Sequence, residues 1–136
     1  MMAKVQLLAF ISLDGYLVEK SVCPFLWESP DRYGITRIRE KAVQVLDPHV
    51  SFLSLVKDKG FSSGYSLMEA EPDTVSVIES MFRFNLVDGI VLYVVPCFQG
   101  NGIRLFTEIP GPSLWKLAGN KSYHTGVCRM IYEKAL

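Results

Sequence analysis

The sequence is poor in cysteine and histidine: it has three cysteines and two histidines, scattered along 136 residues. It contains no Cys-x-x-Cys pair and no two histidines close together. A disulfide framework and a zinc site of ordinary spacing are therefore not predicted. We expect reduced thiols and no bound metal.

Long hydrophobic runs are absent as well. The longest, residues 7–11 and 90–95, have the length of buried strands, whereas a membrane-spanning helix needs roughly 18 apolar residues or more. The N-terminus has one lysine, Lys4, followed by only a short apolar stretch, which is too short for a secretory signal. We therefore expect a cytoplasmic protein that does not associate with membranes.

An excess of charge of one sign is also missing, since 14 basic side chains face 14 acidic ones. Nucleic-acid affinity depends mainly on surplus lysine and arginine, so no nucleic-acid partner is expected. The densest group of cations does not fall on one face of a helix, which favours a solvated surface over an anion site. This group comprises Arg32, Arg37, Arg39 and Lys41.

The hydrophobic fraction, 49%, is typical of a globular chain, and the length fits a single domain over residues 1–136. Residues 5–11, which are apolar except for Gln6, and residues 90–95 predict strands of a parallel sheet covered on both faces. Residues 75–86 place apolar side chains on a broad arc at helical spacing, which predicts an amphipathic helix. We expect Asn85 to adopt a left-handed conformation near the end of this helix.

The remaining elements follow from caps, turns and short apolar runs. Ser29 as N-cap and Pro30 in the first turn predict a helix that runs to Asp47. Residues 50–56 predict a strand, residues 57–71 a loop, and residues 23–28 an irregular segment. Residues 114–118 and 121–133 predict an antiparallel pair that turns at Gly119 and Asn120. Together these elements indicate an α/β protein, a three-layer α/β/α sandwich whose mostly parallel central sheet has an antiparallel C-terminal edge.

Three segments together resemble one family. They are residues 8–16, with the sequence LAFISLDGY; residues 86–90, followed by Pro96, Gly100, Gly102, Leu105 and Phe106; and residues 121–132. In order and spacing they are similar to the dihydrofolate reductase-like domain at the C-terminus of riboflavin-biosynthesis deaminase–reductases, the RibD C-terminal type. The resemblance covers residues 5–27 and 75–134.

This resemblance implies a reductase that uses NADPH. It implies hydride transfer to a small molecule, a pteridine or a ribosylamino-pyrimidine, by a protein that acts as a homodimer. Carried over by position, Asp14 is the candidate catalytic residue. The candidate cofactor- or substrate-binding residues are Ser12, Gly15, Trp27, Gly100, Gly102 and Arg104. The reductase hypothesis requires the tip of the first strand and the glycine turn after Pro96 to meet around one hollow.

Several of these residues have a second interpretation. Asp14 either orients or protonates a substrate, or it bonds its own backbone in the Asp-Gly turn. Trp27 either stacks on a flat heterocycle or covers the core. The Gly100–Gly102 segment either holds a phosphate, with Arg104 as an anion partner, or forms an ordinary turn.

The sequence also departs from the family pattern. The stretch between the first matched segment and the Leu-Val-Asp segment at residues 86–88 is shortened relative to the family, and no Gly-Arg-x-Thr segment is present. Where the family has a glycine pair before its late helix, this chain has Glu69, Glu71 and Asp73, whose carboxylates would oppose a dinucleotide's phosphates. The alternative hypothesis is therefore a non-catalytic member that keeps the scaffold but has lost the dinucleotide site. A third is an interaction module that uses the C-terminal hairpin.

Overall fold

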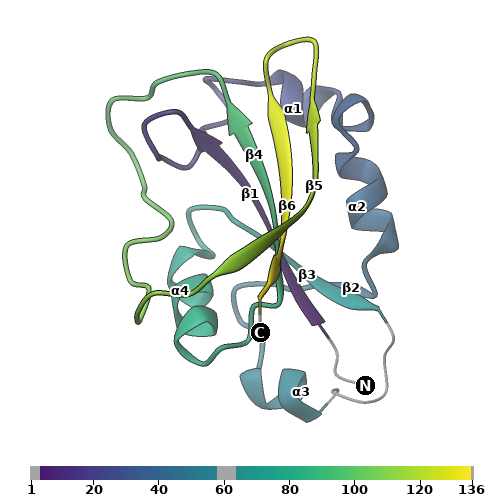
Figure 1. The fold of residues 1–136 in the computed structure, drawn as a ribbon, viewed down its shortest axis with the longest axis vertical. Helices are drawn as coiled ribbons and strands as arrows, with labels where there is room; N and C mark the ends of the chain where they lie inside the picture. The colour runs from purple at the N-terminus through teal and green to yellow at the C-terminus, as the bar shows by residue number, and fades with distance from the viewer. Residues whose placement is uncertain (1–3, 58–63, 136) are drawn as a thin grey trace.

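A mixed six-stranded sheet forms the centre of the protein, with the strand order β2-β3-β1-β4-β6-β5 (Figure 1). The structure is a computed structural model and describes residues 4–57 and 64–135. The first four strands in this order are parallel, and β6 and β5 add an antiparallel edge. The strands are β1 (Lys4–Ser12), β2 (Gln44–Val45), β3 (Tyr65–Glu69), β4 (Gly89–Val95), β5 (Trp115–Ser122) and β6 (Cys128–Lys134).

Strand β1 lies in the middle of the sheet because its side chains are apolar on both faces. It pairs in parallel with β3 on one side and with β4 on the other. Leu7 and Ala9 belong to one buried cluster, whereas Leu8 and Phe10 belong to the other. The predicted burial of this strand on both faces is confirmed.

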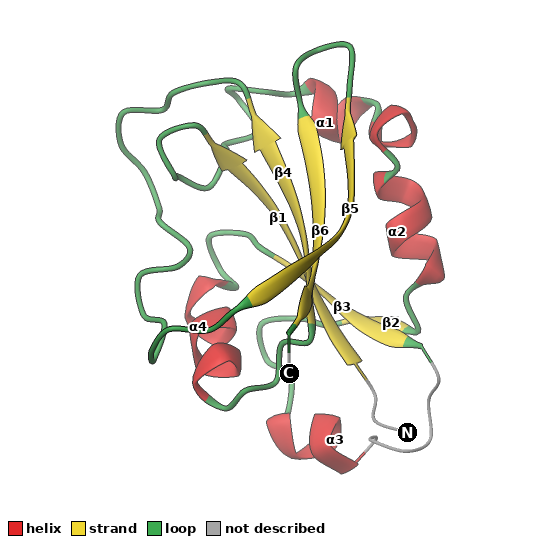
Figure 2. Cartoon of the chain, viewed as in Figure 1, coloured by secondary structure: helices red, strands yellow, loops and turns green. Residues whose placement is uncertain are grey.

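Helices cover both faces of the sheet (Figure 2). On one face, α1 (Phe25–Glu28), the 3-10 helix η1 (Pro30–Tyr33) and α2 (Ile35–Lys41) contribute to the cluster around Leu8 and Phe10. On the other face, α3 (Phe52–Lys57) and α4 (Val75–Arg83) contribute to the cluster around Leu7 and Ala9. The predicted α/β/α sandwich with a parallel core and an antiparallel edge is confirmed.

Helix α4 and its end agree with the sequence pattern. Ile78 and Met81 are fully buried, and Ser76 on another side of the helix is exposed. Asn85 has a φ of 59°, the left-handed conformation expected after the helix. The apolar arc of this segment therefore packs on the sheet as predicted.

The predicted helix from Ser29 to Asp47 is wrong in its extent. The chain forms η1, turns at Gly34 with a φ of 73°, and resumes as α2, which ends at Lys41. Ser29 makes no side-chain cap hydrogen bond. Ala42 is already extended, and the chain continues into the short edge strand β2. A left-handed glycine and an edge pairing thus interrupt a pattern that is helical by spacing alone.

Three other predicted elements are also wrong. The expected strand at residues 50–56 contains helix α3, because a short apolar run fits either element and only tertiary packing decides. The expected loop at residues 57–71 contains strand β3, whose three central residues are buried beside β1. The part of that predicted loop at residues 58–63 lies outside the described residues. The expected irregular segment at residues 23–28 contains α1.

The C-terminal hairpin is antiparallel as predicted, but its turn is elsewhere. Gly119 and Asn120 lie within β5, next to an irregularity in register. The turn is closed by the Tyr123 N–H, which donates to the Val127 carbonyl at 2.8 Å, and Gly126 adopts a φ of 93°. A pair of turn-forming residues therefore sits at a bulge in an edge strand.

Candidate functional site

The turn after β1 is built around the buried hydroxyl of Ser12, whose residue is only 2% exposed. Its Oγ donates to Asp14 Oδ1 at 2.6 Å and accepts from the Tyr16 N–H at 3.0 Å. Gly15 completes the turn with a φ of 86°, a conformation that glycine adopts without strain. Ser12 thus fixes the direction in which Asp14 leaves the strand.

The Asp14 carboxylate joins this turn to the glycine loop after β4. It accepts from the Gln99 N–H at 3.2 Å and from the Gly100 N–H at 2.8 Å. The Leu13 N–H also donates to the Cys97 carbonyl at 2.8 Å. We call Ser12, Asp14, Gln99 and Gly100 the Asp14 latch. The tip of β1 and the glycine loop are therefore in direct contact.

The latch keeps Asp14 ionised. The hydrogen bond from Ser12, followed by the N–H groups of Gly100 and Gln99, lowers the pKa of Asp14 to about 2, although desolvation opposes this shift. At neutral pH the carboxylate therefore has no proton to donate, and its oxygen atoms accept hydrogen bonds from the glycine loop. The part of the Asp14 hypothesis that needs a proton donor has no support in this geometry, while a role in orienting a ligand stays a prediction.

We expect the latch to weaken only in acid. Because the pKa of Asp14 is lowered to about 2 from the ordinary 3.8, its stabilising effect is present above about pH 4 and is lost as the pH falls toward 2. The amide resonances of Gln99 and Gly100 should titrate with an apparent pKa near 2 in an NMR series. In Asp14→Asn the same resonances should not titrate in this range. A transition near pH 4 in the wild type would contradict the latch.

Arg104 and the two glycines of the loop, Gly100 and Gly102, also lie close to the turn after β1. The guanidinium carbon of Arg104 lies 4.4 Å from the Tyr16 ring centroid, and its Nη2 donates to the Tyr16 hydroxyl at 3.2 Å. A Cβ at Gly102 would approach Gln99 Nε2 to 3.2 Å, whereas a Cβ at Gly100 would meet nothing within 4 Å. Gly100, itself part of the latch, therefore has open space where a side chain would lie, whereas Gly102 lies close to the Gln99 side chain.

Gln99 is a site residue that the sequence analysis missed. Its side-chain carbonyl accepts from the Glu19 N–H at 2.7 Å, and its amide group donates to the Leu17 carbonyl at 2.9 Å. These two bonds connect the segment after β1 to the glycine loop, in addition to the connection that Asp14 makes. A single glutamine in a loop has no spacing or partner in the sequence that would single it out.

A pocket of about 430 Å³ lies beside the latch at the carboxyl ends of β1 and β3. This is the edge at which open α/β sheets bind ligands, and the volume suits one heterocycle. Trp27 is the candidate residue that lines it, and the Trp27 ring packs on Phe10 with centroids 5.2 Å apart. The other lining residues are Leu17, Val18, Glu19, Lys20, Ala70, Glu71, Pro72 and Ile103.

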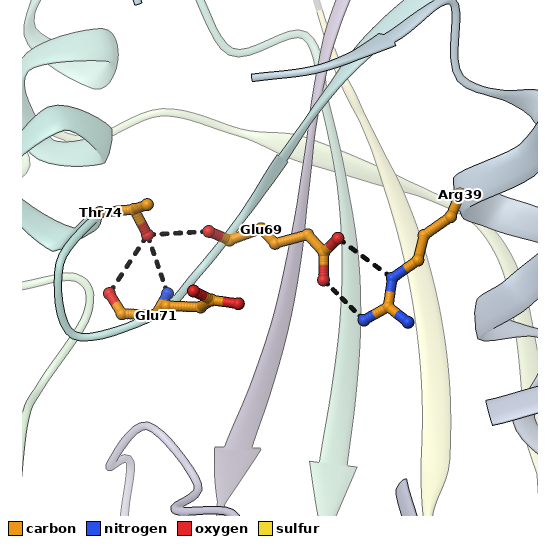
Figure 3. A network of polar contacts seen from close by, with 4 residues as sticks. All are labelled: Arg39, Glu69, Glu71 and Thr74. Carbon is orange, nitrogen blue, oxygen red and sulfur yellow. Dashed lines mark hydrogen bonds and ion pairs between the residues drawn. The ribbon is translucent and has the colours of Figure 1, made fainter. Parts of the chain in front are cut away.

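The acidic segment expected to oppose phosphates is partly neutralised (Figure 3). Glu69 points toward α2, where its two oxygens accept from Arg39 Nη2 at 2.7 Å and Nε at 3.0 Å. The buried Thr74 hydroxyl ties the corner between β3 and α4, because it donates to the Glu69 carbonyl at 2.8 Å and accepts from the Glu71 N–H at 2.8 Å. This corner forms one wall of the pocket.

Of the acidic segment, Glu71 is the residue whose carboxylate lies at the pocket, which Glu19 also lines. Burial raises its pKa first, and the charges of Glu69 and Asp73 raise it further, while Arg39 lowers it. A raised pKa means that the neutral form is stabilised relative to a free glutamate. Of the three acidic residues, Glu71 is therefore the one whose charge bears on a ligand in the pocket.

Within the described ranges, residues 4–57 and 64–135, no three side chains of histidine, cysteine, aspartate or glutamate converge on one point as metal ligands would. No helix in this part of the chain combines the length and apolarity of a membrane span.

The sequence matches no family model and no curated protein, but the fold matches known structures. A protein of Shewanella sp. PV-4, named as a riboflavin biosynthesis protein, is similar with a TM-score of 0.63 at 14% identity, over 100% of both chains. Acinetobacter baumannii RibD is similar with a TM-score of 0.65 at 12% identity, over 99% of this chain and 59% of RibD. Dihydrofolate reductase from Enterococcus faecalis, in complex with NADP(H) and RAB-propyl, gives 0.62 at 9% identity over 100% of both chains. The chain therefore has the dihydrofolate reductase-like fold that these three proteins share.

Proposed function

We propose that the chain is an NADPH-dependent reductase of the dihydrofolate reductase and RibD C-terminal family. Its substrate would be a small molecule with a pteridine- or ribosylamino-pyrimidine-like ring. The observation that carries the proposal is the pocket of about 430 Å³ lined by Trp27. Its lining residues Leu17 and Glu19 are hydrogen-bonded to Gln99 of the Asp14 latch, and Trp27 offers a flat apolar surface to a ring.

The residues at the pocket fit the ring end of the cofactor better than its phosphates. Trp27, Leu17 and Ile103 form an apolar wall for a flat ring, and Lys20 supplies a cation at the same pocket. NADPH, when bound, supplies the hydride, while the chain orients the rings and excludes water. The N–H groups of Gln99 and Gly100 already donate to Asp14, so they are not free donors for a pyrophosphate.

That last observation favours a second candidate function, a non-catalytic member that keeps the heterocycle pocket. In such a protein the glycine loop serves the Asp14 latch alone, and Glu71 at the pocket repels a dinucleotide. This candidate predicts binding of a free pterin or pyrimidine without binding of NADPH.

One titration separates the two candidates. NADPH is added to the protein while the nicotinamide fluorescence is followed, and dihydrofolate and a ribosylamino-pyrimidine are then tested as hydride acceptors. Saturable binding and acceptor-dependent oxidation support the reductase. Absence of NADPH binding at millimolar concentration overturns it and leaves the non-catalytic candidate, which requires binding of a free pterin or pyrimidine.

Removal of the Glu71 charge should strengthen NADPH binding. Glu71→Gln takes one negative charge from the pocket wall and keeps the shape of the side chain, so we expect an affinity gain of roughly threefold to tenfold. In the wild type, affinity should likewise rise as the pH falls through the raised pKa of Glu71, because protonation removes the same charge. Glu79→Gln on α4 is the control, since Glu79 does not line the pocket. Equal affinities for the wild type and Glu71→Gln would contradict this placement of the ligand.

A homodimer and a cytoplasmic location belong to the same proposal. Strand β5 is an outer strand of the sheet, and its exposed side chains include Leu117, which is 47% exposed. An open strand edge with apolar side chains suits pairing with a second copy. Light scattering should give the mass of two chains, and Leu117→Lys should reduce it to that of one.

A further inference from the structure

A second groove lies between α2 and the β5–β6 hairpin, and the latch and the heterocycle pocket share none of its lining residues. Its volume is about 790 Å³. Two acidic residues, Asp31 and Glu40, line it. The cations that line it outnumber them: Arg32, Arg37, Lys41, Lys121 and Arg129. None of these five cations forms an ion pair with a carboxylate in the part of the chain that the structure describes.

The sheet places two of these cations side by side. Arg129 on β6 lies directly opposite Lys121 on β5 and opposite Tyr93 on β4. Directly opposed side chains point to the same face of a sheet at close range, and like charges in this position repel. The hairpin therefore holds a repulsive pair at the wall of the groove, and an anion between the two side chains would relieve the repulsion.

Arg129 is incompletely partnered within the protein. Its Nε atom is buried and has no hydrogen-bond partner among the residues that the structure describes. The neighbouring Tyr93 hydroxyl does not neutralise the guanidinium, because burial and then Tyr123 raise the pKa of Tyr93 to about 12. That hydroxyl donates to the Tyr33 carbonyl and is also hydrogen-bonded to the Arg129 side chain, so it partners the guanidinium without removing its charge or providing for Nε. A buried donor without an acceptor is unfavourable, and an anionic ligand would supply the missing acceptor.

Helix α2 completes the opposite wall. Arg37 and Lys41 are four residues apart and so lie on one face, and both line the groove. Arg39 leaves this face and pairs with Glu69 at the corner of β3. The sequence pattern favoured a solvated surface for the cations of this segment. It did not indicate that three of the four, Arg32, Arg37 and Lys41, line one groove with Lys121 and Arg129 from the C-terminal hairpin.

We propose that this groove binds a phosphorylated small molecule of nucleotide size. Five cations against two acidic residues suit a ligand with more than one negative charge, and the planar fork of arginine matches phosphate oxygens. A volume of about 790 Å³ accommodates more than the phosphates alone. Tyr123 lines the same wall and offers an aromatic surface. Lys121 Nζ lies over its ring, 5.2 Å from the centroid. This site is independent of the proposed reductase function.

The test uses the full chain with ADP, inorganic pyrophosphate and adenosine as probes. Calorimetry should show binding of ADP and pyrophosphate, and at least about tenfold weaker binding of adenosine, which lacks the phosphates. NMR should place the largest ADP-induced shifts at the amides of Thr36, Lys121 and Arg129. Shifts at Leu17 to Lys20 instead would assign the ligand to the heterocycle pocket and would overturn the proposal.

Lys121→Met and Arg83→Met form a matched pair for the same measurement. Each removes one cation, but Arg83 lies at the end of α4 on the other face of the sheet. Lys121→Met should weaken ADP binding about tenfold and leave the thermal stability of the free protein unchanged or higher, because it relieves the repulsion with Arg129. Arg83→Met should bind ADP as the wild type does.

The combination of weaker ADP binding with undiminished thermal stability separates a ligand site from a structural role. A side chain that only supports the fold loses stability when it is truncated, whereas Lys121→Met should lose affinity without losing stability. Equal weakening in Lys121→Met and Arg83→Met would show diffuse attraction and would overturn the proposal. Absence of ADP binding at millimolar concentration would overturn it as well. Because NADPH is not among the probes, neither result depends on the reductase test.

Discussion

Trp27→Ala is expected to lower the free energy of unfolding by about 2–3 kcal/mol and to weaken heterocycle binding at least about tenfold. The first effect follows from lost packing, since the Trp27 ring lies against the buried Phe10, which in turn contacts Tyr93. The stability loss should stay below that of a fully buried tryptophan, because Trp27 is partly exposed at the pocket. The second effect follows from removal of the largest flat surface in the pocket.

Two variants separate these effects. Trp27→Phe keeps an aromatic ring on Phe10 and should recover most of the stability and part of the affinity. Trp115→Ala removes the other tryptophan, which packs on Phe82 at a centroid distance of 6.3 Å and does not line the pocket, so it should leave affinity unchanged. Chemical denaturation measures stability, and a pterin titration measures affinity. If Trp27→Ala bound the pterin as the wild type does, the pocket would not be the ring site, whatever the loss of stability.

Strands β1 and β4 and helix α4 were predictable because their signal lies in neighbouring residues. Strands β1 and β4 are mostly apolar runs, and α4 has an apolar arc at helical spacing. The segment between them was not predictable to the same degree. Strand β3 contains a buried serine, Ser66, whose Oγ accepts from Gln44 Nε2 at 3.0 Å. This contact joins two segments whose pairing the sequence does not specify. Helix α3 and the end of α2 likewise depend on tertiary contacts.

The meeting of the β1 turn with the glycine loop was predictable from the resemblance, but its chemistry was not. The sequence offered Asp14 as a ligand-facing group, and the structure directs its oxygens to Ser12, Gln99 and Gly100. An Asp-Gly turn indicates where the backbone bends, yet it does not indicate which N–H groups the carboxylate will meet across the fold. The roles of these residues toward a ligand remain predictions.

The cation-lined groove was likewise not predictable from the sequence. Its cations come from two segments about 80 residues apart, one formed by η1 and α2 and the other by the hairpin. Helix periodicity sorts the cations within the first segment only. Strand register places Arg129 opposite Lys121, and the true turn at residues 123–127 sets that register. A hairpin centred on Gly119 and Asn120 would have paired different residues.

Gly34→Ala and Gly100→Ala are expected to cost similar stability but to differ in ligand binding. Both glycines are left-handed, with φ values of 73° and 78°, so alanine at either should cost about 1–2 kcal/mol of unfolding free energy. A Cβ at Gly34 would lie 2.8 Å from Arg129 Nη1, whereas a Cβ at Gly100 would meet nothing within 4 Å. Only the first substitution therefore has to displace the guanidinium.

That displacement costs the fold little because the clashing atom is the far end of a long side chain, but it moves a donor group of a residue that lines the groove. We expect Gly34→Ala to weaken ADP binding several-fold and to shift the Arg129 side-chain resonances. Gly100→Ala should leave both unchanged and should alter the amide resonances of the Asp14 latch instead. Thermal unfolding and calorimetry on the two variants measure these quantities. Unchanged Arg129 resonances in Gly34→Ala would mean that the guanidinium does not lie against Gly34. The claim that Arg129 binds the anionic ligand in the groove would then be contradicted.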